Sequence, residues 1–110
     1  MTFHVELTEN AERNVDEILC YIVERSLRGA TAWWNCWRDV VEDLSETADQ
    51  KAFAPESEDH GEDIYHVIFK TRRGLPYRAL FIIRDRTVFI LHVRGPGQDL
   101  VSEDELKLPE

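Results

Sequence analysis

The chain of 110 residues is 43% hydrophobic and carries a formal net charge of −9 at pH 7. This length fits one compact domain, the apolar content excludes wholesale disorder, and no apolar run approaches the roughly 20 residues that span a bilayer. The negative charge argues against broad, non-specific binding to nucleic acid, because like charges repel the phosphate backbone. Two cysteines are too few for a disulfide scaffold, and the N-terminus lacks the features of a secretion signal. We expect a cytoplasmic domain that does not enter a membrane.

The first half of the chain predicts one strand followed by two helices. Residues 2–7 alternate apolar and polar side chains, which is the period of a half-buried strand. Thr8 can cap the helix that follows, and Gly29 is expected to terminate it. A second helix is expected over about 30–47, so that the two helices form an antiparallel hairpin. The apolar faces of these helices contain Ala11, Val15, Ile18, Ile22, Trp33, Trp37, Val40, Val41 and Leu44.

The second half predicts three strands. Residues 48–61 are polar and acidic, and we expect them to form a surface loop. Apolar residues then return at a period of two in 64–70, 77–84 and 87–94, which predicts strands there. The chain therefore predicts an α+β domain with the order β-α-α-β-β-β. Its helix hairpin should pack on one face of an antiparallel sheet and leave the other face open.

Basic residues are concentrated in the expected sheet. Residues 64–98 contain seven lysines and arginines and a single acid. Because side chains alternate between the faces of a strand, one face should be apolar and the other basic. The inward residues are expected to be Tyr77, Ala79, Phe81, Ile83, Phe89, Leu91 and Val93, and the outward ones Lys70, Arg78, Leu80, Ile82, Arg84, Val88, Ile90, His92 and Arg94.

Two stretches, Phe3–Ile22 and Tyr77–Arg94, resemble the RelE/ParE-type toxins. The resemblance rests on the order and spacing of these pieces and spans about residues 2–95. It implies the fold described above, in a single toxin domain over 1–95. Residues 96–110 would be an acidic tail, in which the S-x-x-E spacing of Ser102 and Glu105 predicts a short helix. Family members are toxins of bacterial two-gene toxin–antitoxin modules, in which a co-expressed antitoxin neutralises the toxin.

The resemblance also implies two alternative activities. RelE-like members cleave messenger RNA on the ribosome, whereas ParE-like members poison DNA gyrase without being enzymes. Arg78 and Arg94 match arginines of the family, and Lys70, Arg72 and Arg73 occupy its basic stretch. Many members follow the second arginine with a histidine and further basic residues, but this chain continues with Gly95-Pro96-Gly97. The missing histidine weakens the interpretation as a nuclease.

A metal-free ribonuclease needs a base, an acid and cations that stabilise the developing phosphate charge. The candidate catalytic residues are Arg78, Arg94, Lys70 and His92, and the candidate binding residues are Arg72, Arg73 and Arg84. Tyr77 is a further proton carrier unless it points inward. The four histidines lack metal-ligand spacing, so we expect neither a metal nor another cofactor. Trp34 points away from Trp33 and Trp37 on a helical wheel and can mark a contact surface.

The leading interpretation is a toxin that arrests growth by binding DNA gyrase or the ribosome and is neutralised by a cognate antitoxin. The first alternative is a ribosome-dependent endonuclease that cuts messenger RNA. The second alternative is a non-toxic interaction module that retains the fold and binds the acidic segment of a partner. The expected partners are therefore an antitoxin and a cellular target, with an oligomer possible through the complex.

Overall fold

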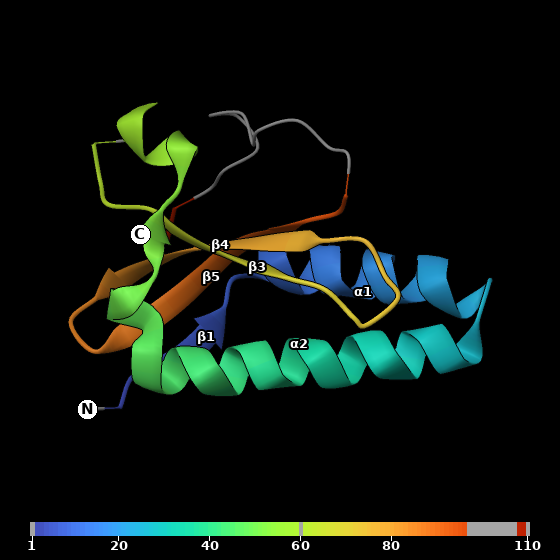
Figure 1. Ribbon diagram of the computed structural model, residues 1–110. Helices are drawn as coiled ribbons and strands as arrows, with labels where there is room; N and C mark the ends of the chain where they lie inside the picture. The colour runs from blue at the N-terminus through green and yellow to red at the C-terminus, as the bar shows by residue number, and fades with distance from the viewer. Residues whose placement is uncertain (1, 60, 97–107, 110) are drawn as a thin grey trace.

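In the computed structural model, two long helices pack against a five-stranded sheet (Figure 1). The structure describes residues 2–59, 61–96 and 108–109, and within these ranges no helix is long and apolar enough to cross a membrane. The elements in chain order are β1 (His4–Leu7), α1 (Glu9–Val23), α2 (Leu27–Thr47), η1 (Ala48–Gln50), β2 (Ala52–Phe53), η2 (Pro55–Asp59), β3 (Tyr65–Phe69), β4 (Tyr77–Arg84) and β5 (Thr87–Arg94). The expected terminal helix around Ser102 lies outside the described residues.

The helix hairpin forms as expected, but the turn between its helices differs. The Thr8 hydroxyl accepts a hydrogen bond from the amide of Ala11 and caps α1. Ser26 caps α2 in the same way, with its Oγ 2.9 Å from the amide nitrogen of Gly29. The prediction that Gly29 ends the first helix was therefore wrong, because the Ser26 cap places this glycine in the first turn of α2.

The sheet has the strand order β1-β5-β4-β3-β2. Neighbouring pairs among β2, β3, β4 and β5 are antiparallel, whereas β1 pairs with β5 in parallel, so the sheet is mixed rather than wholly antiparallel. Side-chain alternation reveals which face of a strand is buried but not the direction of its neighbour, so the sequence did not indicate this pairing. The short strand β2 also lies within the stretch 48–61, which was expected to be a loop.

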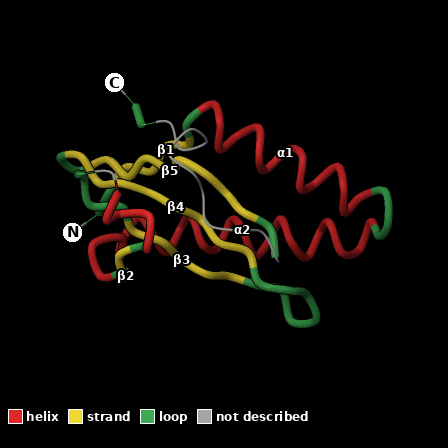
Figure 2. Tube along the Cα trace, turned by 90° about the horizontal axis from the view of Figure 1, so that it is seen from above, coloured by secondary structure: helices red, strands yellow, loops and turns green. Residues whose placement is uncertain are grey.

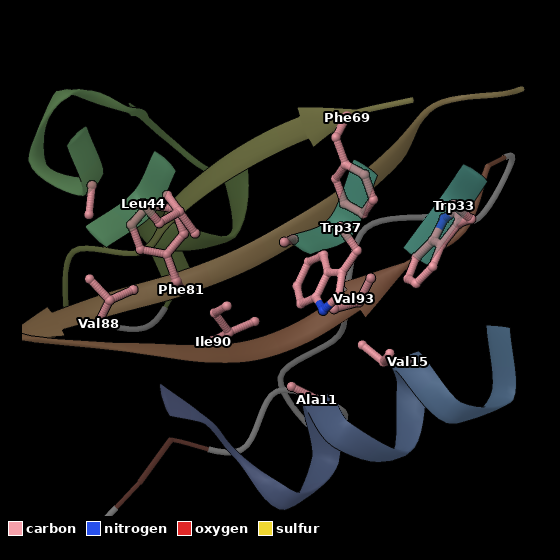
Figure 3. Close-up of a cluster of buried hydrophobic side chains, with 12 residues drawn as sticks. Ala11, Val15, Trp33, Trp37, Leu44, Phe69, Phe81, Val88, Ile90 and Val93 are labelled. Carbon is pink, nitrogen blue, oxygen red and sulfur yellow. The ribbon is translucent and has the colours of Figure 1, made fainter. Parts of the chain in front are cut away.

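Both helices cover one face of the sheet, which we call the helix face (Figure 2). The core on this face contains buried aromatic and aliphatic side chains from both helices and from the central strands (Figure 3). The stacked rings of Trp33 and Trp37 lie against Phe69, with ring centroids 5.4 to 6.0 Å apart. The core residues of this face are Ala11, Val15, Trp33, Trp37, Leu44, Ala48, Phe69, Ala79, Phe81, Val88, Ile90 and Val93.

The opposite face of the sheet, which we call the far face, is covered by the chain that leads from α2 to β3. Residues of this connection lie across the sheet from α2 (Figure 1). Ala54 and Ile64 are buried there against Leu80 and Ile82 of β4, and both β4 side chains are fully buried. The prediction of an open second face was therefore wrong.

A bulge in β5 changes which of its side chains face the helices. Leu80 pairs with His92 but Phe81 pairs with Ile90, so Leu91 is an extra residue in β5. Val93 follows the bulge and faces the helices as expected. In the part of β5 that precedes Val93, the alternation is reversed. Val88 and Ile90 lie on the helix face and Phe89 and Leu91 on the far face, contrary to the prediction for these four residues.

Candidate functional site

Arg78, the first candidate, is paired with a carboxylate of its own chain. Its side chain lies on the far face at the start of β4, where Nη1 is 2.8 Å from Oε1 of Glu56 and Nη2 is 2.5 Å from Oε2. Glu56 belongs to η2 and is only 3% exposed. This two-point geometry is the strongest way for an arginine to hold a carboxylate. The guanidinium expected to receive a phosphate is therefore held by an internal anion.

Arg84, at the other end of β4, has a similar arrangement nearer the surface. Its Nε and Nη2 donate to the two carboxylate oxygens of Glu62, at 3.2 and 2.9 Å. Its Nη1 also donates to the backbone oxygen of Pro109 at 2.5 Å. The hydrogen bonds that Arg84 donates to Glu62 raise the pKa of the guanidinium, so this side chain stays charged. Both arginines of β4 thus have partners, and the far face is not a free basic surface.

His66 is a neighbour of the Arg78–Glu56 pair that was not among the candidate residues predicted from the sequence. It lies on β3, and its Nδ1 is 3.4 Å from Nη1 of Arg78. Burial and, second, the positive charge of Arg78 lower the pKa of His66 below its usual value. The imidazole is therefore held in its neutral form beside this ion pair. The signal in the sequence was alternation: His66 lies between the inward Tyr65 and Val67, so its side chain should point to the same face as that of Arg78.

Lys70, Arg72 and Arg73 lie together in the connection between β3 and β4. All three side chains are exposed, and within the described part of the chain no carboxylate pairs with them. We call residues 70–73 the basic loop. It follows β3 at the end of the sheet where Arg78 and Arg94 face each other across β4 and β5. These cations are therefore exposed at the end of the sheet, whereas the sequence predicted a cationic surface on the open face of the strands.

His92 and Arg94 lie together at the end of β5. His92 is 6% exposed, and its Nδ1 is 3.1 Å from the amide nitrogen of the Asn10 side chain. Its Nε2 lies 3.5 Å from Nη1 of Arg94. Both residues border a cavity of about 640 Å³ between α1 and the end of β5. These two candidates are therefore brought together, whereas Lys70 lies in the basic loop.

Tyr77 points toward the helices, as its phase predicted. Its ring meets that of Trp33 edge to face, with centroids 5.5 Å apart. Burial and, second, the nearby Tyr21 raise the pKa of the Tyr77 phenol. Tyr77 therefore keeps its proton and can donate a hydrogen bond into the cavity that it borders with His92 and Arg94. It is poorly suited to act as a base.

Trp34 is exposed on α2, as expected, with 45% of its surface accessible. It borders a second cavity of about 420 Å³ between the two helices, together with Leu7, Val15, Trp37 and Val41. A large aromatic side chain at the edge of an apolar hollow is typical of contact surfaces. Among the residues that the structure describes, no group of three His, Cys, Asp or Glu side chains lies close enough to hold a metal ion.

Comparisons with known proteins give a clear likeness in fold. No protein-family model and no curated protein matches the sequence. A chain of the chromosomal ParDE toxin–antitoxin system from P. aeruginosa has a similar structure, with a TM-score of 0.64 and 21% identity, over 84% of this chain and 95% of that one. A chain of the toxin–antitoxin complex RelBE2 from Mycobacterium tuberculosis is 26% identical over 86% and 98% of the two chains, with a TM-score of 0.44. The RelE/ParE-like fold expected from the sequence is thus confirmed.

Proposed function

We propose that this chain is the toxin of a two-gene toxin–antitoxin module. It arrests growth by binding an essential target, DNA gyrase or the ribosome, and a cognate antitoxin neutralises it. Residues 1–95 form the toxin domain in this proposal, and 96–110 are an appended acidic tail. The observation that carries the proposal is the likeness to a chain of the ParDE system, which covers 84% of this chain and 95% of that one.

The geometry of the candidate residues favours binding over RNA cleavage. Arg78, the strongest candidate for contacting a phosphate, already holds the buried carboxylate of Glu56. The ring nitrogens of His92 both have neighbours within the fold, because Nδ1 lies 3.1 Å from the amide nitrogen of Asn10 and Nε2 lies 3.5 Å from Nη1 of Arg94. A nuclease of this kind needs both a base and a cation at the scissile phosphate. These residues supply neither in a free form.

The basic loop is the surface that we assign to the target. It offers three exposed cations at the end of the sheet, on a chain whose net charge is otherwise strongly negative. Such a concentrated positive patch steers association with an anionic surface, which both gyrase-bound DNA and ribosomal RNA present.

Cleavage of messenger RNA on the ribosome is the second candidate function. The observation that favours it is the position of the basic loop at the same end of the sheet as Arg94, where the cations together offer several contacts to the phosphates of one RNA strand. The ribosome would have to present the message, since a chain of net charge −9 binds free RNA weakly at physiological salt.

Controlled expression in a bacterium tests the proposal. Induction of the chain alone should stop growth, and co-expression of a small neighbouring gene that encodes the antitoxin should restore it. The triple variant Lys70→Ala/Arg72→Ala/Arg73→Ala should relieve the arrest. The matched control Arg13→Ala/Arg28→Ala/Arg86→Ala also removes three exposed positive charges but lies elsewhere, and it should remain toxic. Normal growth with abundant soluble wild-type chain would favour a non-toxic interaction module instead.

A further inference from the structure

The cavity between α1 and α2, which we call the helix hollow, combines an apolar lining with negative charge. The buried side chains of Val15 and Trp37 line it, and Trp34 at its edge is 45% exposed. Glu12 and Asp16 line it from α1, one turn apart, and both are exposed. Within the part of the chain that the structure describes, no cation pairs with either carboxylate. The hollow of about 420 Å³ therefore suits an apolar side chain that is accompanied by positive charge.

The charges around the helix hollow are unequal on its two sides. Arg38 lines it from α2, one turn after Trp34. On the other side, α1 carries four acids and a single arginine along its length. An incoming cation is repelled by Arg38 and attracted by Glu12 and Asp16. The occupant should therefore place its positive charges against α1.

The basic loop and the residue that follows it carry the required combination. The backbone oxygen of Thr71 accepts a hydrogen bond from the amide of Gly74 at 3.2 Å, so Arg72 and Arg73 occupy the two central positions of a tight turn. Leu75, next in the chain after this turn, is 67% exposed. Two guanidinium groups and one apolar side chain are thus presented by one short segment. Because its turn is already formed, the segment loses little conformational freedom when it binds.

The basic loop cannot reach the helix hollow of its own chain, because α2 lies between them. The Sγ of Cys36 donates a hydrogen bond to the oxygen of Lys70 at 3.4 Å, which holds the start of the loop against α2. Cys36 is two residues from both Trp34 and Arg38, and residues two apart on a helix do not share a face. Figure 2 shows the connection from β3 to β4 on the side of α2 away from α1. The loop and the hollow therefore face opposite sides of this helix.

We propose that the occupant of the helix hollow is the basic loop of a second copy of this chain. In this interface Leu75 fills the hollow beside Trp34, and the two arginines of the turn meet the carboxylates of Glu12 and Asp16. Because the two complementary surfaces lie on opposite sides of α2, the contact is head-to-tail, with each copy contributing a different surface. The contact is small and each copy has a net charge of −9, so the association should be weak and reversible.

Self-association requires neither toxicity nor an antitoxin, so this inference goes beyond the proposed function. If the basic loop also contacts the target, a docked loop is covered, and association and target binding exclude each other. Measurements on the purified chain report on the interface, whereas growth reports on the target. The two proposals can therefore fail separately.

Sedimentation velocity of the full chain between about 10 μM and about 1 mM tests the proposal. The wild type should form dimers as its concentration rises. The hollow variant Glu12→Arg/Asp16→Arg and the loop variant Arg72→Glu/Arg73→Glu should each dimerise more weakly by a factor of about ten or more, because like charges then meet. An equimolar mixture of the two variants should dimerise again, because the unchanged loop of one meets the unchanged hollow of the other. That recovery would also show that both variants are folded.

Matched controls change the same charges elsewhere on the chain. Glu58→Arg/Asp63→Arg alters two exposed acids of the connection from α2 to β3, and Arg28→Glu/Arg86→Glu alters two exposed arginines. Both should dimerise as the wild type does. Leu75→Ser changes no charge and replaces an exposed side chain, so it should weaken dimerisation without affecting the fold.

Four results would overturn the proposal. In the first, the wild-type chain stays monomeric up to about 1 mM, a result that does not depend on whether any variant folds. In the second, the hollow and loop variants dimerise as strongly as the wild type. In the third, both variants keep the circular dichroism spectrum of the wild type but their mixture stays monomeric. In the fourth, a monomeric wild type binds the peptide N-acetyl-Lys-Leu-Arg-Leu-amide with a shift of the Trp34 indole signal, which would assign the hollow to another protein.

Discussion

The two faces of the sheet are both covered over β4 and β5, but by different means. The helix face is covered by two amphipathic helices, and its core is almost entirely apolar. The far face is covered by a short connection between α2 and β3, and it combines a small apolar cluster with the ion pair between Arg78 and Glu56. The difference teaches that a row of arginines along a strand does not by itself define a binding surface. Here the acidic connection supplies the counter-charges, and the free cations lie in the basic loop.

The largest effect is expected on the helix face. Phe81 is fully buried beneath the helices, with its ring stacked on that of Tyr65 at 5.4 Å. Phe81→Asp would place an unpaired carboxylate in this core and should lower the free energy of unfolding by about 4 kcal/mol or more. Chemical denaturation measures the change. A variant as stable as the wild type would contradict the assignment of Phe81 to the core.

Breaking the ion pair on the far face should have the next largest effect. Arg78→Ala removes the guanidinium that holds the buried carboxylate of Glu56, and the expected loss is about 3–5 kcal/mol. The double variant Arg78→Met/Glu56→Leu removes both charges and should recover most of the stability, because an apolar pair of similar size fits a buried site. If Arg78→Ala has the same unfolding midpoint in denaturant as the wild type, the assignment of a buried ion pair would be contradicted.

This expectation changes how toxicity should be tested. Arg78→Ala is the obvious variant for a nuclease, but it should unfold a large part of the protein, so a loss of toxicity would be ambiguous. The double variant keeps the fold while it removes the guanidinium. Growth arrest by the double variant would show that Arg78 does not contact the target.

The pair at the other end of β4 should matter less. The Arg84 and Glu62 side chains are about one-third exposed, so water replaces much of the interaction when it is lost. Arg84→Ala should therefore lower the melting temperature much less than Arg78→Ala does. Equal losses in the two variants would contradict the contrast between a buried and a surface ion pair.

The smallest effect should come from His66 on acidification. The pKa of His66 is lowered below its ordinary value of about 6.5, so the unfolded chain takes up the proton more readily than the folded one. The stability that this neutral ring contributes is fully present above pH 6.5 and is lost as the pH falls through the folded pKa. We expect the difference in the free energy of unfolding between the wild type and His66→Gln to change below pH 6.5, because only the wild type loses this contribution there. A difference that stays constant over this range would contradict the assignment.

Much of the fold could be predicted from the sequence, since the periods of 3.6 and 2 are set by local burial. The elements 9–23, 65–69, 77–84 and 87–94 fall close to their predicted ranges. The cover on the far face was missed because residues 48–61 were interpreted from their acidic composition. The apolar run from Ala79 to Ile83 was a signal, because a strand that is apolar at every position is buried on both faces.

The candidate site could be predicted in its residue types but not in its pairing. The concentration of arginines in β4 and β5 was evident, and so was the inward direction of Tyr77. Glu56 could not be matched with Arg78, because 22 residues separate them and loop composition does not specify contacts. The bulge at Leu91 was also missed, since one additional residue reverses alternation without any mark in the pattern.

Primer extension on abundant messages, in bacteria whose growth the chain has arrested, tests the central claim most directly. If the chain acts by binding, as the pairing of Arg78 with Glu56 indicates, the messages should be intact while growth has stopped. New cuts within codons that appear on induction and depend on active ribosomes would contradict this account and establish the chain as an endonuclease.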